Sequence, residues 1–137
     1  MSADEAKQVV TDFYRLLSEG DAEGAVALLS DDIVWVCEGT TPVSGRYTGL
    51  KSVLEDFFGP VNEHREEGIS FNILDMFGEG DSVVALVEGF MTGKYGRYDN
   101  LYCQIYRVRD GKIYESLEYL DTALVETALF GKKIEAA

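Results

Sequence analysis

One glutamate stands out because its neighbours in the sequence are uncharged and mostly apolar. Glu88 lies within Val84–Phe90, a segment in which it is the only ionisable residue. A carboxylate in apolar surroundings must be hydrogen-bonded, paired with a cation or protonated. Burial raises the pKa of such a group toward the range that suits a general acid or base. Glu88 is therefore a candidate for proton transfer, and the alternative is a position at a rim, open to solvent.

A nucleophile or a metal ion would supply a different chemistry. Cys37 follows the apolar run Ile33–Val36 and could act as a nucleophile if a base lay beside it. The single histidine, His64, follows Pro60 in a charged stretch, and we expect it at the surface. One histidine and two cysteines without a C-x-x-C pair do not provide the clustered ligands of a transition-metal site. We therefore expect no metal and no cofactor.

The elements that position these residues begin with two helices. Apolar residues recur at intervals of three and four between Ala6 and Leu17, which predicts a helix with one buried face. Ser2 and Glu5 fit the start of this helix as a capping box. Asp21 is placed to cap a second, shorter helix.

The middle of the chain changes from strand-like to helical and then to strand-like again. Ile33–Cys37 is typical of a buried strand, and Thr40–Gly49 of a loop. Leu50–Val61 has a helical period that Pro60 should break or kink. From Ile69 onward the period is two, which predicts four strands in a meander. Helices followed by such strands indicate an α+β fold, with helices packed on one face of a curved antiparallel sheet.

Length and charge narrow the function classes. The 137 residues suit one domain with a hydrophobic core, and 25 acidic against 12 basic residues give a net charge of −13. This charge argues against binding to nucleic acid or to an anionic membrane surface. The longest aliphatic run, Val83–Val87, is too short to span a membrane, and the first residues lack the pattern of a signal peptide. We therefore expect a cytoplasmic protein whose acidic residues lie mainly on solvated helix faces and turns.

Two parts of the sequence carry a family resemblance. The first is the helical hairpin with the acids that follow it, Leu17–Ile33. The second comprises Tyr98–Tyr102, Arg109–Ile113 and Leu117–Thr122. In these stretches the chain resembles the SnoaL-like and ketosteroid-isomerase-like branch of the nuclear transport factor 2-like superfamily. The resemblance implies a single domain over residues 1–137 with a cone-shaped α+β barrel of cystatin-like architecture, in which a curved mixed or antiparallel sheet wraps around the N-terminal helices.

The resemblance also implies a pocket between sheet and helices and indicates which residues line it. The matching positions are Phe13, Tyr14, Trp35, Cys37, Glu88, Phe90, Asn100, Tyr102, Gln104 and Glu118. Within each strand they differ by even numbers, as residues on one pleated face must. Glu118 matches a position where related enzymes carry an acid, and the alternative is that it faces water beside Glu115. If Glu88 and Glu118 shared the pocket, repulsion would separate their pKa values and provide one acid and one base.

The family's known catalytic sets are not reproduced. The base, the tyrosine donor and the acid donor of ketosteroid isomerases match Cys37, Phe13 and Gln104, which argues against a steroid isomerase. Limonene-type epoxide hydrolases use an Asp-Arg-Asp trio. Its arginine and one of its aspartates match Glu88 and Phe90 here.

The resulting hypothesis is a pocket that binds a small hydrophobic molecule. Cofactor-independent acid/base catalysis (an isomerase, cyclase, dehydratase or hydrolase) on an apolar carbonyl or polyketide-like substrate would use Glu118 and Glu88, while Asn100, Tyr102 and Gln104 hold an oxygen atom. The alternative is a non-catalytic ligand-binding or dimeric scaffold protein. The resemblance also implies a homodimer, because the sheets of this family pair through their outer faces, and the outward positions of the late strands are apolar enough to need covering. These positions are Leu101, Cys103, Ile105, Leu117 and Tyr119.

Overall fold

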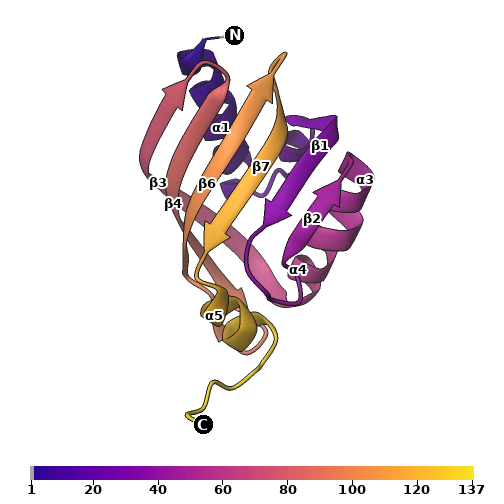
Figure 1. Cartoon of the computed structure of the whole chain (residues 1–137), viewed down its shortest axis with the longest axis vertical. Helices are drawn as coiled ribbons and strands as arrows, with labels where there is room; N and C mark the ends of the chain where they lie inside the picture. Colours follow the sequence, from indigo (N-terminus) through magenta and orange to yellow (C-terminus); the bar gives the residue numbers. More distant parts are fainter. Residues whose placement is uncertain (1) are drawn as a thin grey trace.

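In the computed structural model, which describes residues 2–137, helical segments cover one face of a curved seven-stranded sheet (Figure 1). The helical segments are α1 (Ala3–Ser18), α2 (Ala22–Val26), α3 (Leu50–Ser52), η1 (Val53–Phe58), α4 (Gly59–Glu63), α5 (Thr122–Leu124) and η2 (Val125–Leu129). The strands are β1 (Leu29–Cys37), β2 (Gly45–Thr48), β3 (Arg65–Glu79), β4 (Ser82–Gly93), β5 (Gly96–Arg97), β6 (Asn100–Arg109) and β7 (Lys112–Leu120).

The sheet is mixed and open. Its strand order is β2-β1-β7-β6-β4-β3, with the short β5 paired to β4. The predicted meander is confirmed, because β3, β4, β6 and β7 pair antiparallel in sequence order, while β1 lies parallel to β7. The sheet curves but its edge strands, β2 and β3, do not pair with each other. The expected barrel is therefore an open, curved sheet. The loop expected over residues 40–49 is wrong in part, since Gly45–Thr48 form an edge strand on β1.

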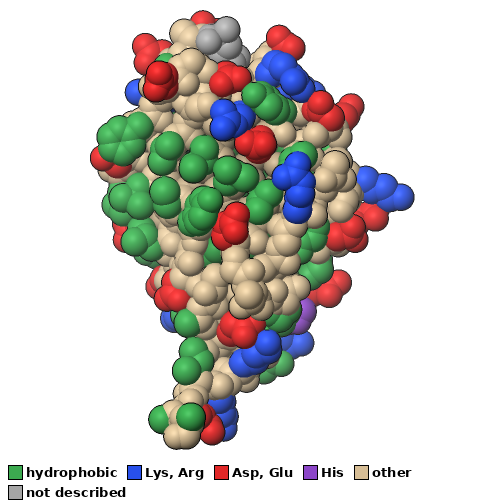
Figure 2. Space-filling model, viewed as in Figure 1, with side chains coloured by type: hydrophobic (Ala, Val, Ile, Leu, Met, Phe, Trp, Pro, Cys, Tyr) green, Lys and Arg blue, Asp and Glu red, His purple; other side chains and the backbone are tan. Residues whose placement is uncertain are grey.

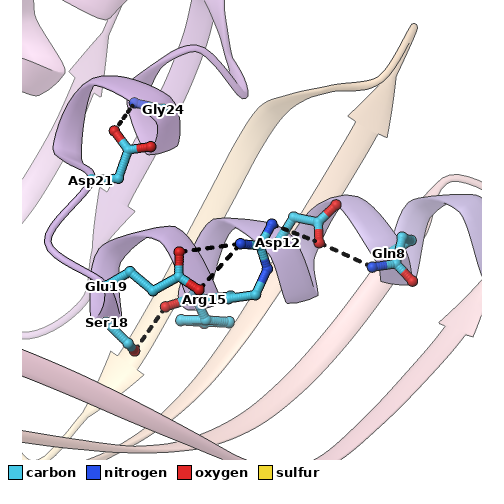
Figure 3. Close-up of polar contacts among 8 residues, drawn as sticks. Gln8, Asp12, Arg15, Ser18, Glu19, Asp21 and Gly24 are labelled. Atoms are coloured by element: carbon cyan, nitrogen blue, oxygen red, sulfur yellow. Dashed lines mark hydrogen bonds and ion pairs between the residues drawn. The ribbon is translucent and has the colours of Figure 1, made fainter.

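The first helix is built as its sequence predicts. The Ser2 side chain accepts a hydrogen bond from the Glu5 backbone N–H and caps α1, whose buried face packs against β3, β4 and β6. On its polar face Arg15 forms ion pairs with two acids (Figure 3). Its Nη2 lies 3.4 Å from Asp12 Oδ1 and its Nη1 lies 3.3 Å from Glu19 Oε2. Asp21 caps α2 through the Gly24 N–H in the same view. These acids therefore lie on solvated helix surfaces, as expected.

The helical segment after β2 does not break at Pro60, one of the two outcomes predicted there, but it changes at Gly59 from π-helical to α-helical. A π-helical turn, η1, leads directly into α4, and Pro60 lies in the first turn of α4. Proline is tolerated at such a position because its missing N–H is not needed there. Two residues of η1, Val53 and Phe57, are buried. The segment therefore packs over one side of the inner face of the sheet.

The sheet face away from the helices is also rich in apolar side chains. Figure 2 shows them gathered over β3, β4 and β6, on the side opposite α1. The large exposed members on these strands and on β7 are Leu74, Phe77, Phe90, Leu101 and Tyr119. No helix among residues 2–137 has the length and apolar character needed to cross a bilayer.

Candidate active site

A cavity of about 340 Å³ lies between the inner face of the sheet and the helical segments. Most of its wall is aromatic or aliphatic, from α1, α2, η1, the strands and η2. The side chains with polar atoms are Tyr14, Trp35, Cys37, Asn62, Arg65, Tyr98, Tyr102, Gln104, Tyr106 and Glu118. An apolar hollow with few convergent polar groups is the usual form of a small-molecule site.

Among the residues that the structure describes, Glu118 is the only carboxylate in this wall, and it is buried. It is 7% exposed and lies in β7 between Cys37 of β1 and Gln104 of β6, its register partners on either side. The Gln104 Nε2 donates to Glu118 Oε2 at 3.2 Å. Burial raises the pKa of Glu118 from 4.5 to about 7, and its interaction with the neighbouring Cys37 thiol partly opposes this rise. Near neutral pH the carboxyl therefore populates both the form that donates a proton and the form that accepts one.

A chain of buried hydrogen bonds ends at this carboxyl. The Tyr14 hydroxyl donates to Gln104 Oε1 at 2.6 Å and lies 2.6 Å from the Tyr106 hydroxyl. Because Tyr14 has one proton and gives it to Gln104, Tyr106 must donate to Tyr14. The amide of Gln104 is thereby oriented with its N–H toward Glu118. Burial raises the pKa of Tyr14 and Tyr106 well above the usual value, so both hydroxyls remain neutral donors.

The other polar groups of the wall come from aromatic residues. Trp35 packs against Phe57 and Phe58, and its indole Nε1 is buried without a hydrogen-bond partner among the described residues. Burial also raises the pKa of Tyr98 and Tyr102, whose hydroxyls remain protonated at neutral pH. The cavity thus offers several neutral donors around one carboxyl, an arrangement that could hold a carbonyl oxygen close to a base.

Two of the expected cavity residues face the other way. On β4 the buried side chains are Val83, Ala85 and Val87, so Glu88 and Phe90 lie on the outer face. Glu88 accepts a hydrogen bond from Asn72 Nδ2 at 3.1 Å, and Phe90 is 37% exposed. The expectation that both line the pocket is wrong, because side chains alternate along a strand and the assumed register was one residue off. The hypothesis of two carboxyls in one cavity fails with it.

Asn100 is buried as expected, but it lies outside the cavity wall. Its Nδ2 donates to the Tyr98 hydroxyl and to the Asp121 carbonyl, both at 3.1 Å. Its Oδ1 accepts from the backbone N–H groups of Leu101 and Asp121. The side chain is saturated by protein partners and fastens the end of β7 to β6. It therefore does not offer a hydrogen bond to a ligand, contrary to the expectation.

The cysteine and histidine do not form a nucleophilic pair. Burial raises the pKa of the Cys37 thiol, which lies in the cavity wall beside Glu118. His64 lies outside that wall, contacts the Pro60 carbonyl through Nδ1 at 2.7 Å and stacks on Phe130. Cys37 and Cys103 are both free thiols. Nowhere in residues 2–137 do three His, Cys, Asp or Glu side chains cluster closely enough to hold a metal ion.

Four polar residues of the cavity wall were not predicted from the sequence. Tyr98 and Tyr106 have the same parity as Tyr102 and Gln104, so the alternation of β6 could have identified Tyr106. Asn62 and Arg65 also reach the wall from the charged stretch after Pro60. That stretch resembles an ordinary solvated surface, and nothing in its pattern indicates a ligand.

The comparisons with known proteins agree with this architecture. An NTF2-like protein from Burkholderia xenovorans LB400 superposes with a TM-score of 0.73 at 23% identity, over 94% of this chain and 98% of that one. An LEH-like epoxide hydrolase of M. tuberculosis superposes with a TM-score of 0.73 at 21% identity, over 93% of this chain and 91% of that one. TerC, co-crystallised with polyporic acid, superposes with a TM-score of 0.77 at 19% identity, over 93% of this chain and 99% of that one. At such identities these likenesses concern the fold alone.

The family assignment comes from the sequence itself. No curated protein matches the chain. The family model of the SnoaL-like domain matches residues 10–116, which include the second half of α1, the sheet through the middle of β7, and most of the cavity wall. The chain therefore belongs to the SnoaL-like domain family, with an NTF2-like fold.

Proposed function

We propose that this protein is a cofactor-independent acid/base catalyst acting on a small, largely apolar carbonyl compound. The observation that carries the proposal is the buried Glu118 carboxyl, alone among apolar walls and held by Gln104. Its pKa of about 7 gives it both protonation states near neutrality. A general acid or base works best with such a pKa.

In the proposed reaction, ionised Glu118 removes a proton from the carbon next to the substrate carbonyl. The electron pair of the broken C–H bond moves into the new C=C bond, and the carbonyl oxygen becomes an enolate oxygen. A neutral donor in the wall, for which we favour the Tyr102 hydroxyl, stabilises that oxygen by a hydrogen bond. The enolate then re-forms the C=O bond. In an unsaturated ketone the electron pair moves to the far carbon of the conjugated enolate, which takes the proton from Glu118 (isomerisation). In a β-hydroxy ketone the C–O bond breaks, its electron pair leaves with the oxygen, and Glu118 protonates the departing hydroxyl (dehydration).

The proton-abstraction step can be tested without knowing the natural substrate. β-Tetralone is a compact, apolar ketone with acidic C–H bonds, and its hydrogen–deuterium exchange in D₂O can be followed by NMR. The wild-type protein should accelerate this exchange, with a rate that rises through an apparent pKa near 7 as Glu118 ionises. Glu118→Gln should reduce the acceleration by about a hundredfold or more. Glu88→Gln, the same chemical change on the outer face, should leave it unchanged.

A non-catalytic ligand-binding protein is the second candidate function. The observation that favours it is the single carboxyl in the cavity wall, where an acid and a base were expected together. Under this alternative, β-tetralone would bind and change the fluorescence of Trp35, the one tryptophan of the chain, without exchange above the buffer rate. Exchange that Glu118→Gln abolishes would rule it out.

A further inference from the structure

One part of the cavity wall that is open to solvent carries a cation. Asn62 in α4 and Arg65 at the start of β3 both belong to the cavity wall. Asn62 is exposed and Arg65 is half-buried, whereas Glu118 is buried in the same cavity wall. An elongated ligand with one end at Glu118 and the other at the solvent-facing part of the wall beside α4 would meet Arg65.

Arg65 is held in place and has no ion-pair partner among the described residues, although the nearby Glu67 carboxylate partly opposes the lowering of its pKa by burial. Its Nε donates to Asn62 Oδ1 at 2.9 Å and its Nη1 to the Glu66 carbonyl at 3.1 Å. Its Nη2 and the Asn62 amide Nδ2 meet no acceptor among the residues that the structure describes. Within that same part of the chain no carboxylate oxygen lies within 4.0 Å of the guanidinium. This part of the cavity wall thus offers free N–H donors and a positive charge.

Arg65 differs from the other arginines in lining the cavity, since Arg46, the other arginine without an ion pair among the described residues, lies outside the cavity wall. The net charge is −13, and four of its arginines, Arg15, Arg97, Arg107 and Arg109, form ion pairs. Partial burial lowers the pKa of Arg65, yet an arginine remains protonated at neutral pH. A set of donors without acceptors, built around a planar guanidinium, matches a group that only accepts hydrogen bonds, and a carboxylate is the best geometric fit.

We propose that the ligand of this cavity carries a carboxylate at the end remote from its reacting carbon, and that Arg65 with Asn62 binds it. The proposal rests on the proposed function in taking the cavity as the substrate site, and it narrows the substrate to an amphipathic organic acid. The arrangement also keeps the ligand's negative charge away from Glu118 and orients the apolar body inward.

The test is a binding comparison between phenylhexanoate and its uncharged amide, phenylhexanamide, read by Trp35 fluorescence and confirmed by calorimetry. The wild-type protein should bind the carboxylate about tenfold more tightly than the amide, the size expected for a charge-assisted hydrogen bond partly exposed to solvent. Arg65→Gln should remove that preference because only the carboxylate gains from the positive charge, and circular dichroism with an unchanged urea midpoint would show that the variant is folded. Arg46→Gln, which removes an exposed and unpaired arginine on β2, should keep the preference.

Three results would overturn the proposal. They are a wild-type protein that prefers the amide or binds the two probes equally, a wild-type protein that binds neither, and an Arg65→Gln variant that still prefers the carboxylate. Failure here is separable from failure of the proposed function. Exchange of β-tetralone through Glu118 without a carboxylate preference would reject only the role of Arg65. A carboxylate preference without exchange would reject only the catalytic role of Glu118.

Discussion

Replacing Glu118 with glutamine should stabilise the protein at neutral and alkaline pH and have little effect in acid. Glutamine has nearly the same shape, and its side-chain oxygen can still accept the hydrogen bond from Gln104. What the substitution removes is the negative charge that the buried carboxyl acquires on ionisation. The stability difference between the two proteins therefore measures how strongly the cavity resists that charge.

The sign and size follow from the pKa of Glu118, which burial raises from 4.5 to about 7. Between these values the native state keeps a proton that the unfolded chain releases, so the stability of the wild-type protein falls as pH rises. The loss is complete above the folded pKa and amounts to about 3 kcal/mol, at about 1.4 kcal/mol per pKa unit. The glutamine variant has no proton to lose at this position and should be more stable than the wild type by about 2–3 kcal/mol at pH ~8.

Urea unfolding from about pH 5 to about pH 8.5, at one protein concentration, gives the required free energies. Trp35 is buried and is the only tryptophan, so its fluorescence reports loss of the core around the cavity. Subtracting the wild-type value at each pH removes the titration of all other groups. Glu88→Gln is the matched control on the outer face and should stay within about 0.5 kcal/mol of the wild type throughout.

A stability difference for Glu118→Gln that does not change with pH would refute the reasoning. So would a variant that is less stable than the wild type at pH ~8. Either result would mean that the ionised carboxyl is well solvated or well paired in the native state. The cavity would then lack the one feature on which its proposed acid/base chemistry depends.

Other outcomes follow from the same packing. Tyr14→Phe removes a buried hydroxyl that makes two hydrogen bonds, so the free energy of unfolding should fall by about 2 kcal/mol at every pH in the same urea series; a loss below about 0.5 kcal/mol would contradict the hydrogen-bond chain. In a Cys103→Ser background, iodoacetamide should alkylate Cys37 about a hundredfold more slowly in the native protein than in urea, because burial raises the pKa of this thiol and shields it; equal rates by mass spectrometry would place it in solvent. Since Leu101 and Tyr119 leave apolar surface exposed on the outer sheet face, we propose a homodimer through that face. Sedimentation should show a wild-type dimer and a monomer for the double variant Leu101→Lys/Tyr119→Lys, and a wild-type monomer at low micromolar concentration would exclude it.

The sequence predicts the fold well where one face of an element is polar. The capping of α1 by Ser2 and the turn at Asp110 and Gly111, both with positive φ, follow from local chemistry that the residues carry themselves. The meander follows from a period of two. In β4 the same argument fails, because every residue from Val83 to Val87 is apolar and both faces of the strand satisfy the pattern. The orientation of Glu88 then depends on the exact register, which the sequence alone does not fix.

The site is less predictable because its key contacts join distant parts of the chain. Tyr14 and Gln104 are both expected at the cavity, yet the bond between them spans 90 residues and requires α1 to lie across β6 at one particular height. Arg65 is harder still. Its neighbours in the sequence are charged, which is typical of an exposed segment. It lies in the cavity wall because the helical segment continues through Pro60 and β3 begins directly after it, at Arg65.

A cavity with one carboxyl restricts the reactions it can support. Opening an epoxide with water needs a base and an acid at the same time, and therefore two groups held in different protonation states. Glu118 can be one of them, but the nearby tyrosines have pKa values raised by burial, which makes them hydrogen-bond donors rather than proton sources. Moving a proton between two atoms of an enolisable ketone needs only one group, first as base and then as acid. A carboxyl with a pKa of about 7 populates both forms, and on this ground we propose isomerisation or dehydration, rather than hydrolysis, as the reaction of this site.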